Sequence, residues 1–109
     1  MSYDESLAAR VRKLLSRRRD FAEKKMFGGV GFLRNGKMCV GVWKEFLIVL
    51  VGPDAYSAAL AEPFTKKFDI TGRAMKGWVM VLAEGVADGD DLKAWVERAT
   101  RFVASLDDE

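Results

Sequence analysis

The sequence predicts an α+β fold: an antiparallel sheet of about five strands, with amphipathic helices at the amino and carboxyl ends packed on it. Apolar residues recur at helical spacing in residues 2–18 and again in residues 88–106. Between these segments, Asn35-Gly36 separates two apolar runs, which is typical of a tight hairpin because both central turn positions need a positive φ. A chain of 109 residues is enough for one such domain, so we expect a single domain over residues 1–109.

The first helix is expected from Ser2 to about Arg18. Its apolar stripe comprises Leu7, Ala8, Val11, Leu14 and Leu15. Asp4 and Glu5 suit the amino end of this helix, where the macrodipole is positive. The last helix is expected to start after an N-cap at Asp88, and its stripe comprises Leu92, Trp95, Val96, Ala99, Phe102, Val103 and Leu106.

Strands are expected at residues 24–27, 30–34, 37–43, 46–51 and 78–83, with a short edge strand around residues 67–70. Residues 46–51 are apolar at every position, which is typical of a central strand covered on both faces. A short helix is expected at residues 53–61, because Pro53 suits the first turn of a helix. The two long helices can cover one face of the sheet. The other face then needs the short helix, a loop or a second subunit, so we expect a homodimer.

The composition excludes several classes of chemistry. The chain has no histidine, so it lacks the commonest general base and metal ligand. With a single cysteine it cannot form an internal disulfide or a usual structural zinc site. We therefore expect no enzyme activity, no cofactor and no metal. The longest apolar run is too short to span a bilayer and the amino end does not resemble a secretory signal, so the expected location is the cytoplasm.

The charge is unevenly distributed along the chain. Residues 1–44 hold 11 Lys and Arg against 4 Asp and Glu, whereas residues 45–109 hold 7 against 12. The resulting net charges of +7 and −5 leave +2 for the whole chain. Such a chain can offer a basic face to an anionic partner, or its two halves can pair with each other or across two subunits.

Three separated segments carry a family resemblance. Residues 25–38, Lys-Met-Phe-Gly-Gly-Val-Gly-Phe-Leu-Arg-Asn-Gly-Lys-Met, resemble the start of the TfoX/Sxy amino-terminal domain. Residues 72–79, Gly-Arg-Ala-Met-Lys-Gly-Trp-Val, and residues 91–96, Asp-Leu-Lys-Ala-Trp-Val, are similar to two later segments of one branch of that family. The three segments come in the expected order, and the resemblance as a whole spans roughly residues 5–106.

The resemblance implies an α+β domain often found in dimers or in two-domain proteins. The best-known members are competence regulators that act with a cyclic-AMP-responsive transcription factor and carry a second, helical domain. The sequence ends just after the expected closing helix, so we expect no counterpart of that domain. We therefore expect a non-enzymatic TfoX-like regulatory domain that binds DNA or a transcription-associated protein. The alternative is a dimeric small-anion-binding or scaffold protein.

Two sets of basic residues are the candidate binding sites. Phosphate contacts need cations along one surface, and the candidates for nucleic-acid binding are Arg10, Lys13, Arg17, Lys24 and Lys25. Arg73 and Lys76 flank Met75 beside Gly77 and Trp78, where two cations near an aromatic ring can hold a phosphate or carboxylate. Each set also has a purely structural interpretation. The first set can be the solvated face of a helix, and in the second Met75 and Trp78 can anchor the loop to the core while the two cations stay in water.

Two further features have structural interpretations. The glycines of Gly28-Gly29-Val30-Gly31 lead into a strand rather than a helix, so they indicate a bend and close backbone packing instead of a phosphate-binding loop. Cys39 lies among apolar residues and is expected in the core, with redox sensing as the alternative.

Overall fold

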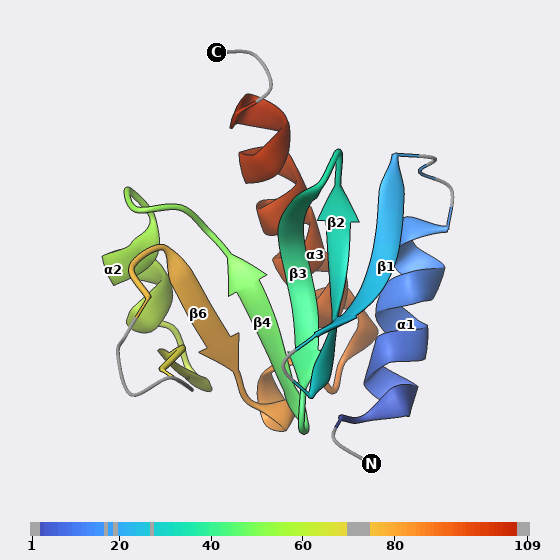
Figure 1. The fold of residues 1–109 in the computed structure, drawn as a ribbon. Coiled ribbons are helices and arrows are strands. Elements are labelled where there is room, and N and C mark those ends of the chain that lie inside the picture. The colour runs from blue at the N-terminus through green and yellow to red at the C-terminus, as the bar shows by residue number, and fades with distance from the viewer. Residues whose placement is uncertain (1–2, 17, 19, 27, 70–74, 107–109) are drawn as a thin grey trace.

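A computed structural model describes residues 3–16, 18, 20–26, 28–69 and 75–106, which form a sheet covered by helices on one side (Figure 1). The strands are β1 (Phe21–Met26), β2 (Gly29–Arg34), β3 (Lys37–Trp43), β4 (Phe46–Leu50), β5 (Thr65–Lys67) and β6 (Trp78–Val81). The helices are α1 (Glu5–Leu15), α2 (Tyr56–Leu60) and α3 (Gly89–Leu106), with a short 3₁₀ turn at Ala83–Gly85. All strand pairs are antiparallel, and the strand order is β1-β2-β3-β4-β6-β5.

The predicted α+β fold class is confirmed, and the sheet has six strands among the described residues instead of about five. β4 lies between β3 and β6, and Leu47, Ile48 and Val49 are all buried, as expected for a central strand. The Asn35-Gly36 turn joins β2 to β3, with φ values of 51° and 82°. Two strand positions were wrong: β1 begins at Phe21, and the edge strand β5 lies at Thr65–Lys67. Residue 70, where that edge strand was expected to end, lies outside the described residues.

The helix ends are set by side-chain caps. α1 begins at Glu5 instead of Ser2, because the Asp4 carboxylate accepts hydrogen bonds from the Ser6 and Leu7 amides at 2.9 and 3.1 Å. It also ends earlier than expected, at Leu15. Asp88 caps α3 as predicted, accepting from the Asp90 amide at 2.8 Å. The short helix covers only Tyr56–Leu60.

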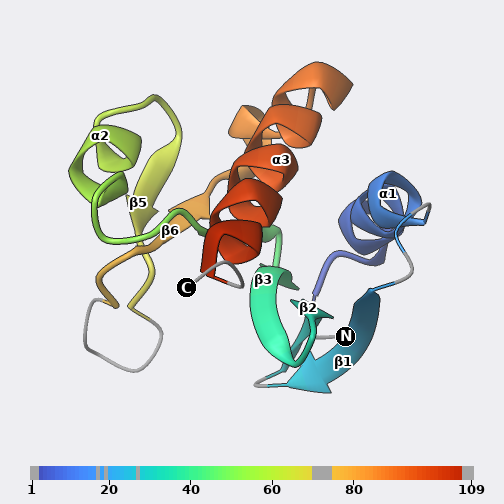
Figure 2. The same cartoon turned by 90° about the horizontal axis from the view of Figure 1, so that it is seen from above.

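All three helices lie on the same face of the sheet (Figure 2). α1 and α3 pack side by side on this face, and α2 packs against β5 and β6. The Thr65 hydroxyl fixes α2 there, because its oxygen lies 2.8–3.2 Å from the carbonyl oxygens of Ala59, Leu60 and Glu62 and its one proton can be donated to any of them. The short helix was one of three elements that we expected could cover the second face of the sheet. Because it packs on the same face as α1 and α3, that prediction is wrong. Among the described residues, no helix has the length and apolarity needed to cross a bilayer.

The main core lies between the sheet and its helices. Strand residues such as Val40, Leu47 and Val79 meet Val11 of α1 and Val103 of α3 in one cluster of buried side chains. Trp95 belongs to this cluster, as predicted, and the Arg98 guanidinium lies 4.1 Å from the centre of its ring. Arg98 also forms an ion pair with Glu62 at 2.8 Å, which ties α3 to the segment after α2.

Candidate functional site

Arg10 of the predicted nucleic-acid set has a structural partner. Its guanidinium donates to the carbonyl oxygens of Val86 and Ala87 at 2.8 and 3.2 Å, just before α3 begins. These hydrogen bonds join α1 to the segment that leads into α3. They occupy donors that a phosphate contact would otherwise use.

Lys13 lies beside Arg10 in a groove between α1 and α3. The groove has a volume of about 620 Å³ and is lined by Arg10, Lys13, Leu14, Ser16, Gly89, Leu92 and Lys93. A smaller hollow of about 120 Å³ shares Leu14 and Lys93 with it and adds Arg18. Lys13, Arg18 and Lys93 therefore lie along the α1–α3 seam, and we call these three residues the helix-side strip. The acidic Glu97 also lines the smaller hollow.

The other predicted nucleic-acid residues do not join this strip. Lys24 and Lys25 are neighbours on the edge strand β1, so their side chains point to opposite faces of the sheet. Lys24 is paired with Gly31 on the face without helices, whereas Lys25 is paired with Val30 on the helix face. Arg17 lies outside the described residues.

The predicted anion-binding pair is placed only in part. Lys76 is exposed in the turn before β6, and Gly77, with φ 95°, closes this turn. The Gly77 carbonyl accepts from the amides of Val51 and Gly52 at 2.9 and 3.1 Å, so the turn is tied to the end of β4. Arg73 lies outside the described residues.

Two charged pairs hold β1 in place. The Arg12 side chain donates two hydrogen bonds of 2.6 Å to Glu23, and these hydrogen bonds lower the pKa of the Glu23 carboxyl. Arg34 donates to Asp20 at 2.6 Å and lowers the pKa of that carboxyl in the same way. Each pair therefore holds β1 or the residue before it to a neighbouring element.

Cys39 is fully buried in the main core, as predicted. Burial raises the pKa of its thiol to about 12, because the thiolate loses its hydration there. Such a thiol is a poor nucleophile near neutral pH. Within the part of the chain that the structure describes, no three His, Cys, Asp or Glu side chains gather as metal ligands would.

The face of the sheet without helices is apolar. Directly opposed residues in an antiparallel sheet point to the same side, and one row across it is Gly31, Gly41, Ile48, Met80 and Lys66. We call this side, which also carries Met26, Met38, Trp43 and Phe46, the open face. Ile48 and Met80 are only 2% and 3% exposed, although none of the helices that the structure describes covers them. Other side chains of this face therefore lie across them.

Glycines let these side chains lie flat on the sheet. A Cβ at Gly31 would be 3.2 Å from the Met26 methyl carbon and 3.4 Å from the Met38 sulfur. A Cβ at Gly41 would be 2.6 Å from the Met38 methyl carbon. The two methionines thus occupy space that any larger residue at Gly31 or Gly41 would take.

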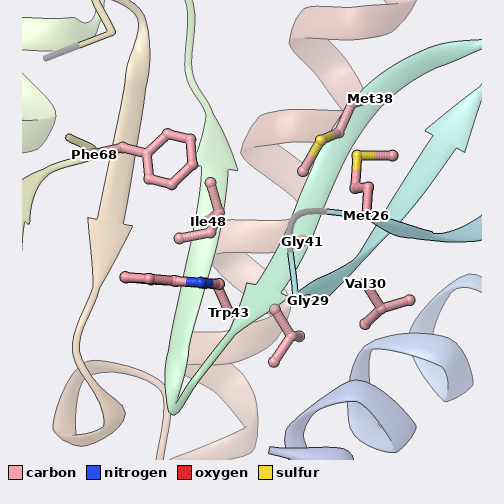
Figure 3. Close-up of a pocket in the computed structure, with 9 residues that line it drawn as sticks. Met26, Gly29, Val30, Met38, Gly41, Trp43, Ile48 and Phe68 are labelled. Carbon is pink, nitrogen blue, oxygen red and sulfur yellow. The ribbon is translucent and has the colours of Figure 1, made fainter. Parts of the chain in front are cut away.

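Aromatic side chains stand opposite the methionines. Trp43, Ile48 and Phe68 line the other side of a shallow slot, which Figure 3 shows between them and the Met26–Met38 pair. Trp43 packs on Phe46, and Phe68 packs on Trp78, with ring centres 6.1 and 6.2 Å apart. The slot has a volume of only about 30 Å³, so it is a surface depression instead of a ligand cavity.

The described residues form a small α+β domain whose helices cover one face of the sheet and leave the other, apolar face without a helix. The sequence matches the model of the TfoX N-terminal domain over residues 13–103. This chain therefore belongs to the TfoX N-terminal domain family, and the resemblance seen in its motifs is confirmed. Comparisons with curated proteins and with solved structures gave no match.

Proposed function

We propose that this chain is a non-enzymatic regulatory domain that acts by binding another protein through the open face. The observation that carries the proposal is the apolar surface of Met26, Met38, Trp43 and Phe68 on a sheet whose three helices all lie on the other side. These side chains are half-buried and gather on one side of the sheet, and such a grouping of apolar residues supports a site of protein association. Membership in the TfoX N-terminal domain family supports a regulatory role.

The chemistry of the chain supports a binding role over catalysis. The sequence has no histidine, and the only cysteine is buried with its pKa raised to about 12. The two carboxylates whose pKa values are lowered, Asp20 and Glu23, each accept a hydrogen bond from an arginine and serve to hold β1. A single cysteine also favours a reducing compartment, and we place the protein in the cytoplasm on that ground.

Affinity capture from the source cells with paired variants tests this proposal. The open-face variant is Trp43→Ala/Met38→Gln, and the matched control on the other side of the sheet is Lys13→Glu/Lys93→Glu. We expect a stoichiometric protein partner with the wild type and the control variant, and its loss with the open-face variant. Equal recovery of that partner with all three forms would contradict the proposal.

A second candidate function is DNA binding through the helix-side strip. Lys13, which belongs to the predicted phosphate-contact set, lies with Arg18 and Lys93 along two adjoining hollows between α1 and α3. Fluorescence anisotropy of labelled duplex DNA over a salt series tests it. If Lys13 and Lys93 contact phosphates, Lys13→Glu/Lys93→Glu should weaken binding and reduce the log–log salt slope by about 2. Lys24→Glu/Lys66→Glu, on the open face, is the control.

A further inference from the structure

Three lysines surround the apolar centre of the open face. Lys24 lies on β1 and Lys66 on β5, which are the two edge strands of the sheet, and both residues are exposed on this face. Lys44, in the β3–β4 turn, places its ammonium 4.6 Å from the centre of the Trp43 ring. Of the charged residues that the described strands place on this face, none is acidic. Lysines therefore border the apolar centre at both sheet edges, and on a third side the β3–β4 turn carries Lys44 beside the exposed acidic Glu45.

The shape of the open face favours a side chain of a macromolecule as its ligand. The slot of about 30 Å³ between Met38 and Trp43 is far smaller than the several hundred Å³ of a typical small-molecule site. Methionine side chains are unbranched and adapt to the shape of a partner. Met26 and Met38 rest on glycine backbone, so they can move aside for one apolar anchor residue.

The charges disfavour a second copy of this chain as the occupant. In a two-fold dimer the same patch faces itself, so two apolar centres would meet together with two sets of lysines. Lys24, Lys44 and Lys66 of each copy would then crowd the same rim, and like charges across an interface oppose association. A partner with acidic residues beside its apolar stripe would turn the same lysines into attractive contacts.

We propose that the open face binds an amphipathic helix of the partner protein, with an apolar stripe over the Met26–Met38–Trp43 slot and acidic residues toward Lys24, Lys44 and Lys66. This inference rests on the proposed function and specifies the chemistry of the partner. A helix in this position would give the sheet the second covering layer that its own three helices do not supply. The recognition is of the helix-in-groove kind, in which a few anchors on one helical face enter an apolar surface.

Titration with designed peptides tests the inference. The probe is a fluorescein-labelled helical peptide with leucine at i, i+3, i+4 and i+7 and glutamate on both flanks. One control peptide carries lysine in place of each glutamate, and another carries alanine in place of each leucine. The protein is used as wild type, Met38→Gln, Lys24→Glu/Lys66→Glu and Lys13→Glu/Lys93→Glu, with thermal melts to verify folding. Met38→Gln keeps the side-chain length, and Lys24 and Lys66 are exposed, so these variants are expected to fold.

The acidic leucine peptide should bind the wild type and Lys13→Glu/Lys93→Glu equally, within about twofold. Its affinity should fall by about tenfold in Met38→Gln and in Lys24→Glu/Lys66→Glu, because each removes part of the central anchor or its charged rim. The alanine peptide should not bind.

Three results would overturn the inference, and they differ in what they mean for the proposed function. Equal binding of the lysine peptide, still sensitive to Met38→Gln, would refute the acidic chemistry and leave protein binding at the open face intact. A stable dimer in sedimentation equilibrium that Met38→Gln dissociates would make a second copy the occupant. Absence of peptide binding would refute a helical partner, and the capture experiment would then decide separately whether the open face binds a protein.

Discussion

Replacing Gly29 or Gly31 with alanine adds the same methyl group to the same face of β2, but the two positions offer it different space. At Gly29 the new Cβ would lie under 3.0 Å from the Val42 carbonyl oxygen and 3.3 Å from the Trp43 Cα. Both neighbours are backbone atoms of β3, so they move only if the strand pairing is disturbed. At Gly31 the nearest neighbours are the ends of the Met26 and Met38 side chains, at 3.2 and 3.4 Å.

The expected change in the free energy of unfolding follows from these neighbours. Alanine restricts the unfolded chain, which stabilises the folded state by about 0.4–1 kcal/mol at either site. At Gly31 a small shift of two flexible side chains offsets this gain, so the net change should stay within about 0.5 kcal/mol. At Gly29 overpacking against backbone costs about 1–3 kcal/mol or more, and we expect a net loss of about 2 kcal/mol. That loss corresponds to a fall in Tm of roughly 8–16 °C for a domain of about this size.

Urea unfolding followed by circular dichroism measures both variants against the wild type. The comparison is valid if the three m values agree, because the midpoints then report stability alone. A Gly29→Ala variant as stable as the wild type, or equal losses at the two positions, would refute the reasoning about the glycines of β2.

Three further perturbations have defined outcomes. Gly52→Ala should destabilise the protein by more than 2 kcal/mol in a thermal melt, because Gly52 has φ 87° and its Cβ would lie under 3.0 Å from the Phe102 ring; a melt like that of the wild type would contradict this. Glu23→Gln should cost at most about 1 kcal/mol at pH 7, since the pair with Arg12 is largely exposed. Folding lowers the pKa of Glu23 below its ordinary value of 4.5. The difference in free energy of unfolding between the wild type and Glu23→Gln should therefore persist at pH values above 4.5 and shrink as the pH falls through the lowered pKa. A difference that stays constant over this pH range in urea melts would contradict the prediction. Cys39 should resist iodoacetamide at pH 8 in the native protein and react on unfolding, because it is buried and its pKa is about 12; rapid native labelling followed by mass spectrometry would refute its burial.

Periodicity and turn chemistry were enough to predict the fold class. The helical stripe of α3, the Asn35-Gly36 hairpin and the apolar run of β4 are local signals, and each was found where it was expected. Element ends were less accurate because they depend on single contacts. Asp4 caps α1 two residues after its expected start at Ser2. The Thr65 hydroxyl lies within hydrogen-bond distance of three carbonyl oxygens at the end of α2, and β5 accordingly lies earlier in the chain than predicted.

A second sheet face was expected, but the residues of the open face were missed for a specific physical reason. The pairing of β2 with β3 shifts between Phe32 and Leu33, so that Leu33 opposes Met38 while Phe32 opposes Val40. Cys39 is the extra residue of this irregularity, and it places Met38 on the same face as Gly41 and Trp43. Simple alternation along β3 would have assigned Met38 to the core face with Val40. The one available signal was the alternate glycines of β2, which leave room on one side of a strand.

For the basic residues, too, the pattern along a single element predicted only part of the surface that they form. Arg10 and Lys13 share a helix flank, and the structure places them together, but Lys93 joins them only because α3 packs beside α1. Lys24 and Lys25 are adjacent in sequence, and the strand sends them to opposite faces. The spacing of charges along α1 therefore predicted the basic residues that this helix contributes to the groove. The residue that α3 contributes could not be predicted in this way, because its position depends on how the two helices pack.

The most direct test of the account is a methyl NMR titration of protein labelled at methionine and alanine methyl groups with the acidic leucine peptide. The Met26 and Met38 methyls lie on the open face, whereas the Ala8 and Ala99 methyls are buried on the helix side of the sheet and serve as internal controls. We predict saturable shifts of the Met26 and Met38 signals with little change at Ala8 and Ala99. Shifts confined to the helix-side alanines, or unchanged methionine signals at saturating peptide, would contradict the assignment of the open face as the binding surface.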